Sequence, residues 1–156
     1  MQITKDQILC LLEKHSRCVT NLFVASTLPC IQSQASEGVV LSDQKDPLSD
    51  YSQLESFVRE VYVSEEAERL LNGAKHIYEN VDGKTAVILD HVQYLPVFVD
   101  WAHPEVLSIT ESENQATILV SLLALEIMDG TEQEKFEISM EAAYENGTWK
   151  LKKCYH

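Results

Sequence analysis

The strongest constraint on the fold is the strict alternation of apolar and polar residues between positions 135 and 144. The apolar positions share one parity: Phe136, Ile138, Met140, Ala142 and Tyr144. A period of two indicates a β-strand with one face on a core and the other in water. Asn146-Gly147 follows, and this pair favours the positive φ angles of a type I′ turn. The segment therefore predicts a tight hairpin that returns through Trp149 and Leu151.

More strands are expected upstream of this hairpin. Val106–Thr110 and Ala116–Ile127 have strand character, so the last third of the chain predicts long consecutive antiparallel strands. A shorter hairpin is predicted around Asp82-Gly83, between His76–Tyr78 and Thr85–Leu89. Gln93–Pro104 breaks the pattern and is expected to lie outside the strands.

The first half of the chain reads as helical. Thr4 begins a capping box that predicts a helix running to about Ser26. A second capping box at Ser52 starts another helix, and Ser64 caps a third that ends at Asn72-Gly73. His15 falls on or beside the apolar stripe of the first helix, and packing is its expected role.

The remaining N-terminal segment, Cys30–Ser49, is rich in Gln, Ser and Asp, and only Val39–Leu41 has strand character. This composition predicts the most flexible segment of the chain. Helices followed by a meander of strands indicate one α+β domain over residues 1–156. We expect one long and two short N-terminal helices packed on one face of a curved antiparallel sheet.

The charge balance restricts the partners. Acidic residues outnumber basic ones by 25 to 12, which gives a net charge of −13. Such a chain is repelled by phosphate backbones and anionic membrane surfaces, and it is attracted to basic partners. Solubility alone is the other explanation of the charge. No segment approaches the roughly 20 apolar residues that span a bilayer, so no membrane insertion is expected.

The cysteines show no metal-ligand spacing, and we expect neither a metal nor a cofactor. Cys10 and Cys18 are eight residues apart on one predicted helix, too far to pair with each other. Buried free thiols are the expected state of the cysteines. A bridge between Cys30 and Cys154 is left open.

The residues show no catalytic motif. Asp90 and His91 are neighbours on a strand, so their side chains point to opposite faces. Asp100 and His103 supply residue types for acid–base chemistry and meet only if the intervening chain turns. Aromatic and imidazole side chains also suggest a candidate pocket, with core packing as the alternative; its members are Tyr62, Tyr94, Trp101 and His103.

The order of elements resembles the cone-shaped, cystatin-like domains, of which the nuclear-transport-factor-2-like superfamily is the best-known group. More narrowly, several segments resemble the bacterial cell-wall DL-endopeptidase inhibitor family (IseA-like). They are Leu54–Leu71, Tyr78–Lys84, Asp100-Trp101 leading into Val106–Val120, and Tyr144–Leu151.

The resemblance implies a non-catalytic protein that blocks a basic peptidoglycan-cleaving cysteine endopeptidase through an acidic surface. It also implies an extracytoplasmic location if a leader has been removed; otherwise the cytoplasm is expected. The carboxylates near the last hairpin are the candidate contacts: Glu126, Asp129, Glu132, Glu134, Glu137 and Glu141. The alternatives are a small-molecule-binding cone or minor enzyme using Asp100 and His103, and a structural module of a larger envelope assembly.

Overall fold

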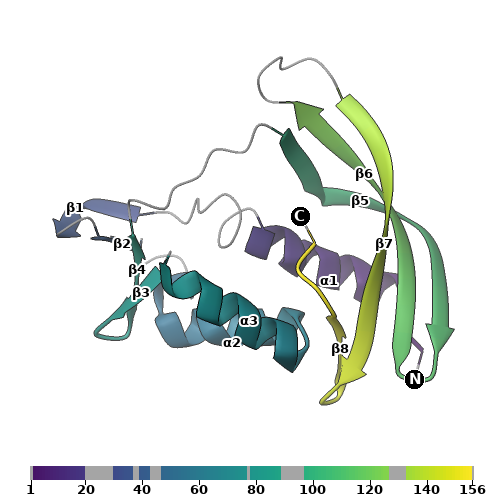
Figure 1. Cartoon of the computed structure of the whole chain (residues 1–156), viewed down its shortest axis with the longest axis horizontal. Helices are drawn as coiled ribbons and strands as arrows, with labels where there is room; N and C mark the ends of the chain where they lie inside the picture. The colour runs from purple at the N-terminus through teal and green to yellow at the C-terminus, as the bar shows by residue number, and fades with distance from the viewer. Residues whose placement is uncertain are drawn as a thin grey trace.

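The computed structural model describes residues 2–19, 30–36, 39–42, 47–76, 78–88, 97–126 and 133–155. Within these ranges the chain forms three α-helices and two antiparallel sheets of four strands each. In Figure 1 the larger sheet curls along the right-hand side, and the smaller sheet lies at the opposite end of the molecule. The α+β class predicted from the sequence is confirmed.

The larger sheet is a simple meander. Its strands are β5 (Val97–Ser112), β6 (Gln115–Glu126), β7 (Gln133–Glu145) and β8 (Thr148–Leu151), in the order β5-β6-β7-β8. The predicted antiparallel arrangement of the C-terminal strands is confirmed.

Alternation along the central strands creates the core face. Ile118 of β6 lies opposite Met140 of β7, and both side chains are fully buried. The intervening positions, such as Thr117 opposite Glu141, are exposed. Burial of the side chains on one face stabilises the sheet by about 25 cal/mol per Å² of apolar surface removed from water. A shift of one residue would expose these side chains, so burial also fixes the register of the strands.

β5 begins earlier than the sequence predicts. Gln93–Pro104 was expected to lie outside the strands, but pairing starts at Val97 and resumes after an irregularity between Asp100 and Glu105. Pro104 falls within that irregularity, on an edge strand where its missing N–H removes no ladder hydrogen bond. The expected break is therefore a bulge within one long strand.

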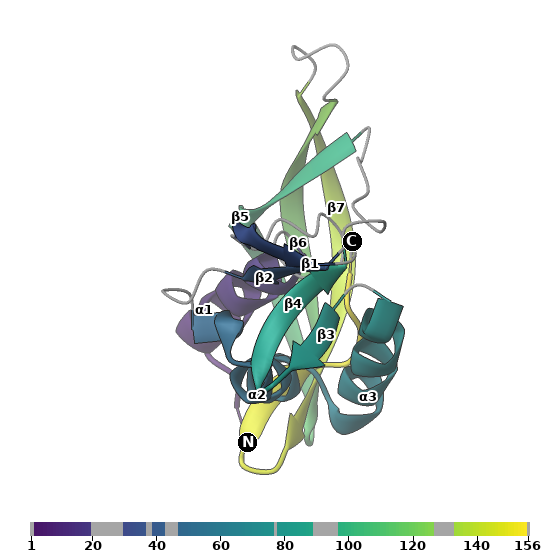
Figure 2. The same cartoon turned by 90° about the vertical axis from the view of Figure 1, so that its left-hand side faces the viewer.

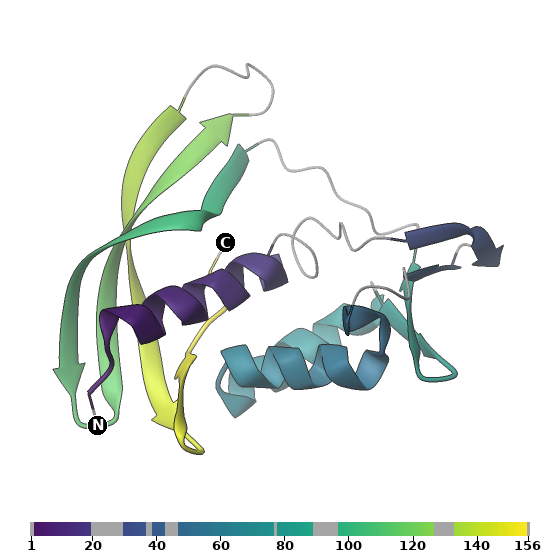
Figure 3. The same cartoon turned by 180° about the vertical axis from the view of Figure 1, so that it is seen from behind.

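Helix α1 (Lys5–Arg17) runs across the concave side of the larger sheet, where it packs mainly on β5 and β8 (Figure 3). The predicted capping box at Thr4 is confirmed, because its side chain accepts from the Gln7 N–H. The α-helix covers Lys5–Arg17, and Cys18 and Val19 continue it with π-helical geometry. Residues 20–26 of the predicted helix lie outside the described residues.

Helices α2 (Tyr51–Val61) and α3 (Ser64–Gly73) pack on each other, but their predicted caps are wrong. Asp50, rather than Ser52, caps α2, and its carboxylate accepts from the Ser52 N–H at 2.9 Å. Ser64 is the first residue of α3, and its N–H donates to the Glu145 carboxylate of β7 at 3.1 Å. A tertiary contact thus replaces the local cap.

The smaller sheet has the strand order β1-β2-β4-β3. Its members are β1 (Cys30–Ser36), β2 (Val39–Ser42), β3 (Tyr78–Val81) and β4 (Lys84–Ile88). The hairpin around Asp82-Gly83 is confirmed, as is the strand character of Val39–Leu41 within the segment Cys30–Ser49, whereas the prediction of a single sheet is wrong. That segment contains β1, β2 and the 3-10 turn η2 (Pro47–Ser49). A second 3-10 turn, η3 (Ala74–His76), follows α3. Figure 2 looks onto the smaller sheet.

Gly147 tests the predicted tight turn between β7 and β8. Its φ of 85° and that of Asn146 at 53° are both positive, as a type I′ turn requires. Gly147→Ala is expected to lower the free energy of unfolding by about 1 kcal/mol, because a Cβ is strained at this φ. Gly73→Ala is the matched control, since Gly73 has no positive φ and open space around its Cα. Urea denaturation of the two variants should give opposite or clearly unequal shifts; equal shifts would contradict the turn assignment.

Candidate functional site

The acidic residues predicted near the last hairpin are only partly brought together. Glu137 and Glu141 are exposed on the outer face of β7, away from α1. Glu134 is also exposed, but its parity is that of Phe136, on the opposite face of the strand. Glu126 is the last residue of β6, and its side chain is not described. Asp129 and Glu132 lie outside the described residues.

Glu137 and Glu141 share the outer face of the sheet with polar residues and with lysines. Across the sheet, Glu137 lies opposite Ser121 and Glu141 opposite Thr117. The Lys152 ammonium lies 3.9 Å from the Glu141 carboxylate, whereas Glu137 has no ion-pair partner within the described ranges. Lys135, two positions before Glu137, is exposed on the same face of β7, so this face carries both carboxylates and lysines.

Asp100 and His103 do meet. The His103 Nδ1 lies 3.0 Å from Asp100 Oδ2, and the bulge of β5 brings the two side chains onto one side. The His103 side chain is 81% exposed. The contact orients the imidazole, but it does so at the surface in full contact with water.

The candidate pocket is not assembled as one site. Tyr62 and Trp101 are core residues, 0% and 2% exposed, whereas His103 is exposed. Tyr94 lies outside the described residues. In place of a pocket wall, Trp101 packs edge-on against the fully buried His15 ring, with centroids 4.6 Å apart.

Sequence reasoning missed a buried polar chain that links three segments. His15 Nδ1 of α1 lies 2.6 Å from the Tyr62 hydroxyl, and that hydroxyl lies 3.4 Å from the Cys154 sulfur. A proton on Nδ1 satisfies this chain, since His15 then donates to Tyr62 and Tyr62 donates to Cys154. No local sequence pattern could have predicted the contact between Tyr62 and Cys154, because these residues are 92 positions apart.

Burial sets the protonation states of this chain. It raises the pKa of the Tyr62 hydroxyl and of the Cys18 and Cys154 thiols above their ordinary values. All three groups are therefore protonated at neutral pH, and protonated thiols are poor nucleophiles. Cys154 is not part of a disulfide, so the bridge to Cys30 left open by the sequence is not formed.

Glu66 of α3 fixes the C-terminal segment. Its Oε2 accepts from the Cys154 N–H at 2.7 Å and from Arg69 Nη2 at 3.0 Å. Burial opposes ionisation of Glu66, but the hydrogen bonds from Arg69 and from the Cys154 backbone outweigh it and lower its pKa. The carboxylate is thus a charged anchor between α3 and the chain end.

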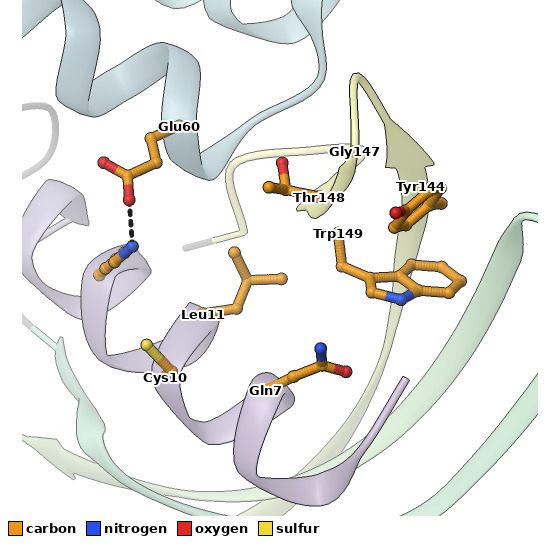
Figure 4. A pocket seen from close by; sticks show the side chains of 9 residues that line it. Gln7, Cys10, Leu11, Glu60, Tyr144, Gly147, Thr148 and Trp149 are labelled. Carbon is orange, nitrogen blue, oxygen red and sulfur yellow. Dashed lines mark hydrogen bonds and ion pairs between the residues drawn. The ribbon is translucent and has the colours of Figure 1, made fainter. Parts of the chain in front are cut away.

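A cleft of about 380 Å³ opens between α1 and the β7–β8 hairpin. Figure 4 shows Gln7, Cys10 and Leu11 on one wall, with Tyr144, Thr148 and Trp149 on the other. An ion pair between Lys14 and Glu60 lies at its rim. The Tyr144 and Trp149 rings pack against each other with centroids 5.6 Å apart. This cleft is separate from the pocket that the sequence suggested.

Neither a metal centre nor a membrane-spanning helix is present in the described ranges. No group of three or more His, Cys, Asp or Glu side chains there is arranged to hold a metal ion. Among the same residues, no helix combines the length and apolar character that crossing a membrane requires.

Fold and surface together define an α+β structure with an apolar core that encloses a short chain of polar groups, and with exposed carboxylates on the outer face of β7. Comparison with known proteins adds no family: no protein-family model matches the chain, and no curated protein matches it.

Proposed function

We propose that this protein is a non-catalytic module that binds a basic protein partner through the outer face of β7. The observation that carries the proposal is the exposed pair Glu137 and Glu141 on one face of β7, in a chain with a net charge of −13. Complementary charge accelerates encounter with a basic surface and fixes its orientation.

The interior supports binding over catalysis. Its titratable groups are hydrogen-bonded to one another, and the raised pKa of Tyr62 and of the buried thiols keeps them protonated at neutral pH. The one carboxylate–imidazole contact predicted from the sequence, Asp100 with His103, is exposed to water. In water such a pair lacks the desolvation that strengthens electrostatic catalysis.

The partner class we propose is a basic peptidoglycan DL-endopeptidase, which the protein inhibits. The support is the resemblance of four sequence segments to the endopeptidase inhibitor family, together with the acid charge. We also propose that α1 and the curled sheet form a cone of the cystatin-like type, since α1 lies across the concave side of β5–β8.

Charge reversal tests the proposal. We expect Glu137→Lys combined with Glu141→Lys to lower affinity for a purified endopeptidase catalytic domain by about tenfold at low salt. Wild-type binding should weaken as salt rises, because ions screen the attraction. Glu79→Lys, an exposed change on β3, is the control for net charge alone. Surface plasmon resonance and a peptidoglycan hydrolysis assay at two salt concentrations measure both effects.

The possible results distinguish a wrong contact surface on this protein from a wrong choice of partner enzyme. The double variant changes the net charge twice as much as Glu79→Lys does. A loss of binding free energy only about twice that of Glu79→Lys would therefore show that net charge alone matters, and it would contradict the β7 contact. If the endopeptidase does not bind at low salt, where attraction is strongest, that enzyme is not the partner.

A second candidate function is the binding of a small organic ligand in the cleft of Figure 4. Its mixed lining favours this, since Leu11, Tyr144 and Trp149 offer apolar surface beside the Lys14–Glu60 ion pair. A ligand-observed NMR screen tests it. Hits whose signals are unchanged by Thr148→Trp, which fills the cleft, would count against this site.

A further inference from the structure

Half of β7 has a partner strand on one side only. β8 pairs with β7 over Ala142–Glu145. The chain end then extends the contact by one residue: the Lys152 N–H donates to the Glu141 carbonyl at 2.9 Å, and the Glu141 N–H donates to the Tyr155 hydroxyl at 2.8 Å. From Gln133 to Met140, β6 is the only described strand that pairs with β7. In Figures 1 and 3 this half of β7 rises away from β8 and the helices, with no described element along its outer edge.

The direction of the backbone groups along this edge follows from Glu141. In an antiparallel strand the N–H and C=O of one residue point to the same side, and the side alternates from residue to residue. Those of Glu141 point away from β6, while the Tyr144 N–H points the other way, to the Asn114 carbonyl. The N–H and C=O groups of Lys135, Glu137 and Ser139 therefore point to the open edge. Within the described ranges, none of these residues has a further hydrogen bond or ion pair.

The side chains beside this edge differ on the two faces. On the concave face, Phe136 and Ile138 are only half-buried although they contact the core. On the outer face lie the exposed carboxylates Glu137 and Glu141, together with the exposed Lys135 and Ser139. A strand added here would place alternate side chains on these two faces. Apolar residues would cover Phe136 and Ile138, and basic residues would lie beside the carboxylates.

We propose that a basic, extended segment of the partner adds antiparallel to β7 along Lys135–Ser139, as a fifth strand of the larger sheet. The inference rests on the proposed function and specifies how the same face recognises its partner. Charge selects the occupant: a second copy of this chain also carries a net charge of −13 and is repelled, whereas a basic segment is attracted. Antiparallel pairing is favoured because its hydrogen bonds are the better aligned. The recognised pattern is strict alternation of basic and apolar residues.

The probe is the peptide acetyl-Lys-Val-Lys-Val-Lys-Val-Lys-amide, and its control is acetyl-Lys-Lys-Val-Val-Val-Lys-Lys-amide, which has the same composition and charge. Residues opposite each other in an antiparallel pair share a face, so the lysines that lie beside Glu137 also direct their N–H groups at β7. The valine N–H groups point to solvent. N-methylation of the inner lysines should thus block pairing, and N-methylation of the valines should not.

Binding is followed by fluorescence anisotropy, and amide hydrogen exchange of the protein is followed by NMR. We expect the alternating peptide to bind at least about tenfold more tightly than the block peptide, and lysine N-methylation to remove that advantage. On binding, the amides of Lys135, Glu137 and Ser139 should gain protection from exchange. Equal binding of the two peptides, equal effects of the two N-methylations, or protection elsewhere would overturn the inference.

Variants of the protein give an independent readout. Ser139→Pro deletes an edge N–H without removing a hydrogen bond to β6, a position where strands tolerate proline. It should weaken binding of the alternating peptide, while Ser139→Ala, which keeps the N–H, should not. Because wild-type protein is used for the N-methylation series, the test stands even if Ser139→Pro folds poorly.

Failure of this inference is distinguishable from failure of the proposed function. Salt-sensitive binding that depends on Glu137 and Glu141 but is indifferent to alternation and N-methylation would overturn strand addition and leave the acidic binding face standing. Binding that depends neither on Glu137 and Glu141 nor on alternation and N-methylation would overturn both strand addition and the proposed function. Dimerisation through β7 in the absence of peptide, seen as a doubled mass in light scattering and abolished by Ser139→Pro, would overturn the choice of a basic segment as occupant.

Discussion

Replacing Trp101 by alanine is expected to lower the free energy of unfolding by about 3–5 kcal/mol. Trp101 is 2% exposed and packs against the His15 ring between α1 and the sheet. Its removal leaves a cavity at the one place where α1, β5 and the buried polar chain meet. Urea denaturation followed by circular dichroism measures the change, and the transition midpoint should fall while its slope is unchanged.

Two further variants decide what this residue does. His103→Ala, two positions along β5 and exposed, should change stability by no more than about 0.5 kcal/mol. Trp101→Phe should recover much of the loss, since a ring remains against His15 and an indole N–H that has no partner in the described ranges is removed. Similar losses at Trp101 and His103 would contradict the separation of core and surface that the structure assigns to these two members of the predicted pocket.

The parts of the fold that the sequence predicted are those that neighbouring residues determine. Thr4 and Gln7 cap α1 within one turn of helix, and Asn146-Gly147 closes a hairpin by itself. The parity of β7 likewise places Glu137 and Glu141 on one outer face. The same alternation along β7 places Glu134 on the opposite face. The prediction had grouped Glu134 with Glu137 and Glu141 because all three lie near the last hairpin in the sequence.

The parts that escaped prediction depend on residues far apart in the chain. Serine is a common helix N-cap, but the N–H of Ser64 donates to the carboxylate of Glu145, 81 positions away. Val39–Leu41 had strand character in the sequence, but Cys30–Ser36 had none; it forms β1 beside β2, which in turn pairs with β4 of a later hairpin. The β7 edge is open because β8 is short, and no local pattern in β7 reports the length of its neighbour.

Glu66 also makes a contact between distant parts of the chain, so its substitution is expected to affect stability strongly. Glu66→Ala is expected to lower the free energy of unfolding by about 1.5–3 kcal/mol, because it removes a charged acceptor from the buried Cys154 N–H and from Arg69. Glu65→Ala, an exposed change one residue earlier in the first turn of α3, is the matched control and should cost far less. Equal losses at the two positions would show that helix electrostatics, and not the anchored chain end, account for the effect.

The pH dependence gives Glu66 a second signature. Its pKa is lowered in the folded protein, so its ionised form stabilises the fold above the unfolded carboxyl value of 4.5, and this contribution is lost as the pH falls through the folded value. Glu66→Gln preserves shape and one acceptor but cannot titrate. Thermal melts between neutral pH and pH 3 should therefore show a gap between wild type and Glu66→Gln that narrows below about pH 4.5. A gap that stays constant over this range would mean that the charge of Glu66 does not hold the C-terminal segment. In that case Cys154 would be positioned by its place in the core, beside Tyr62, alone.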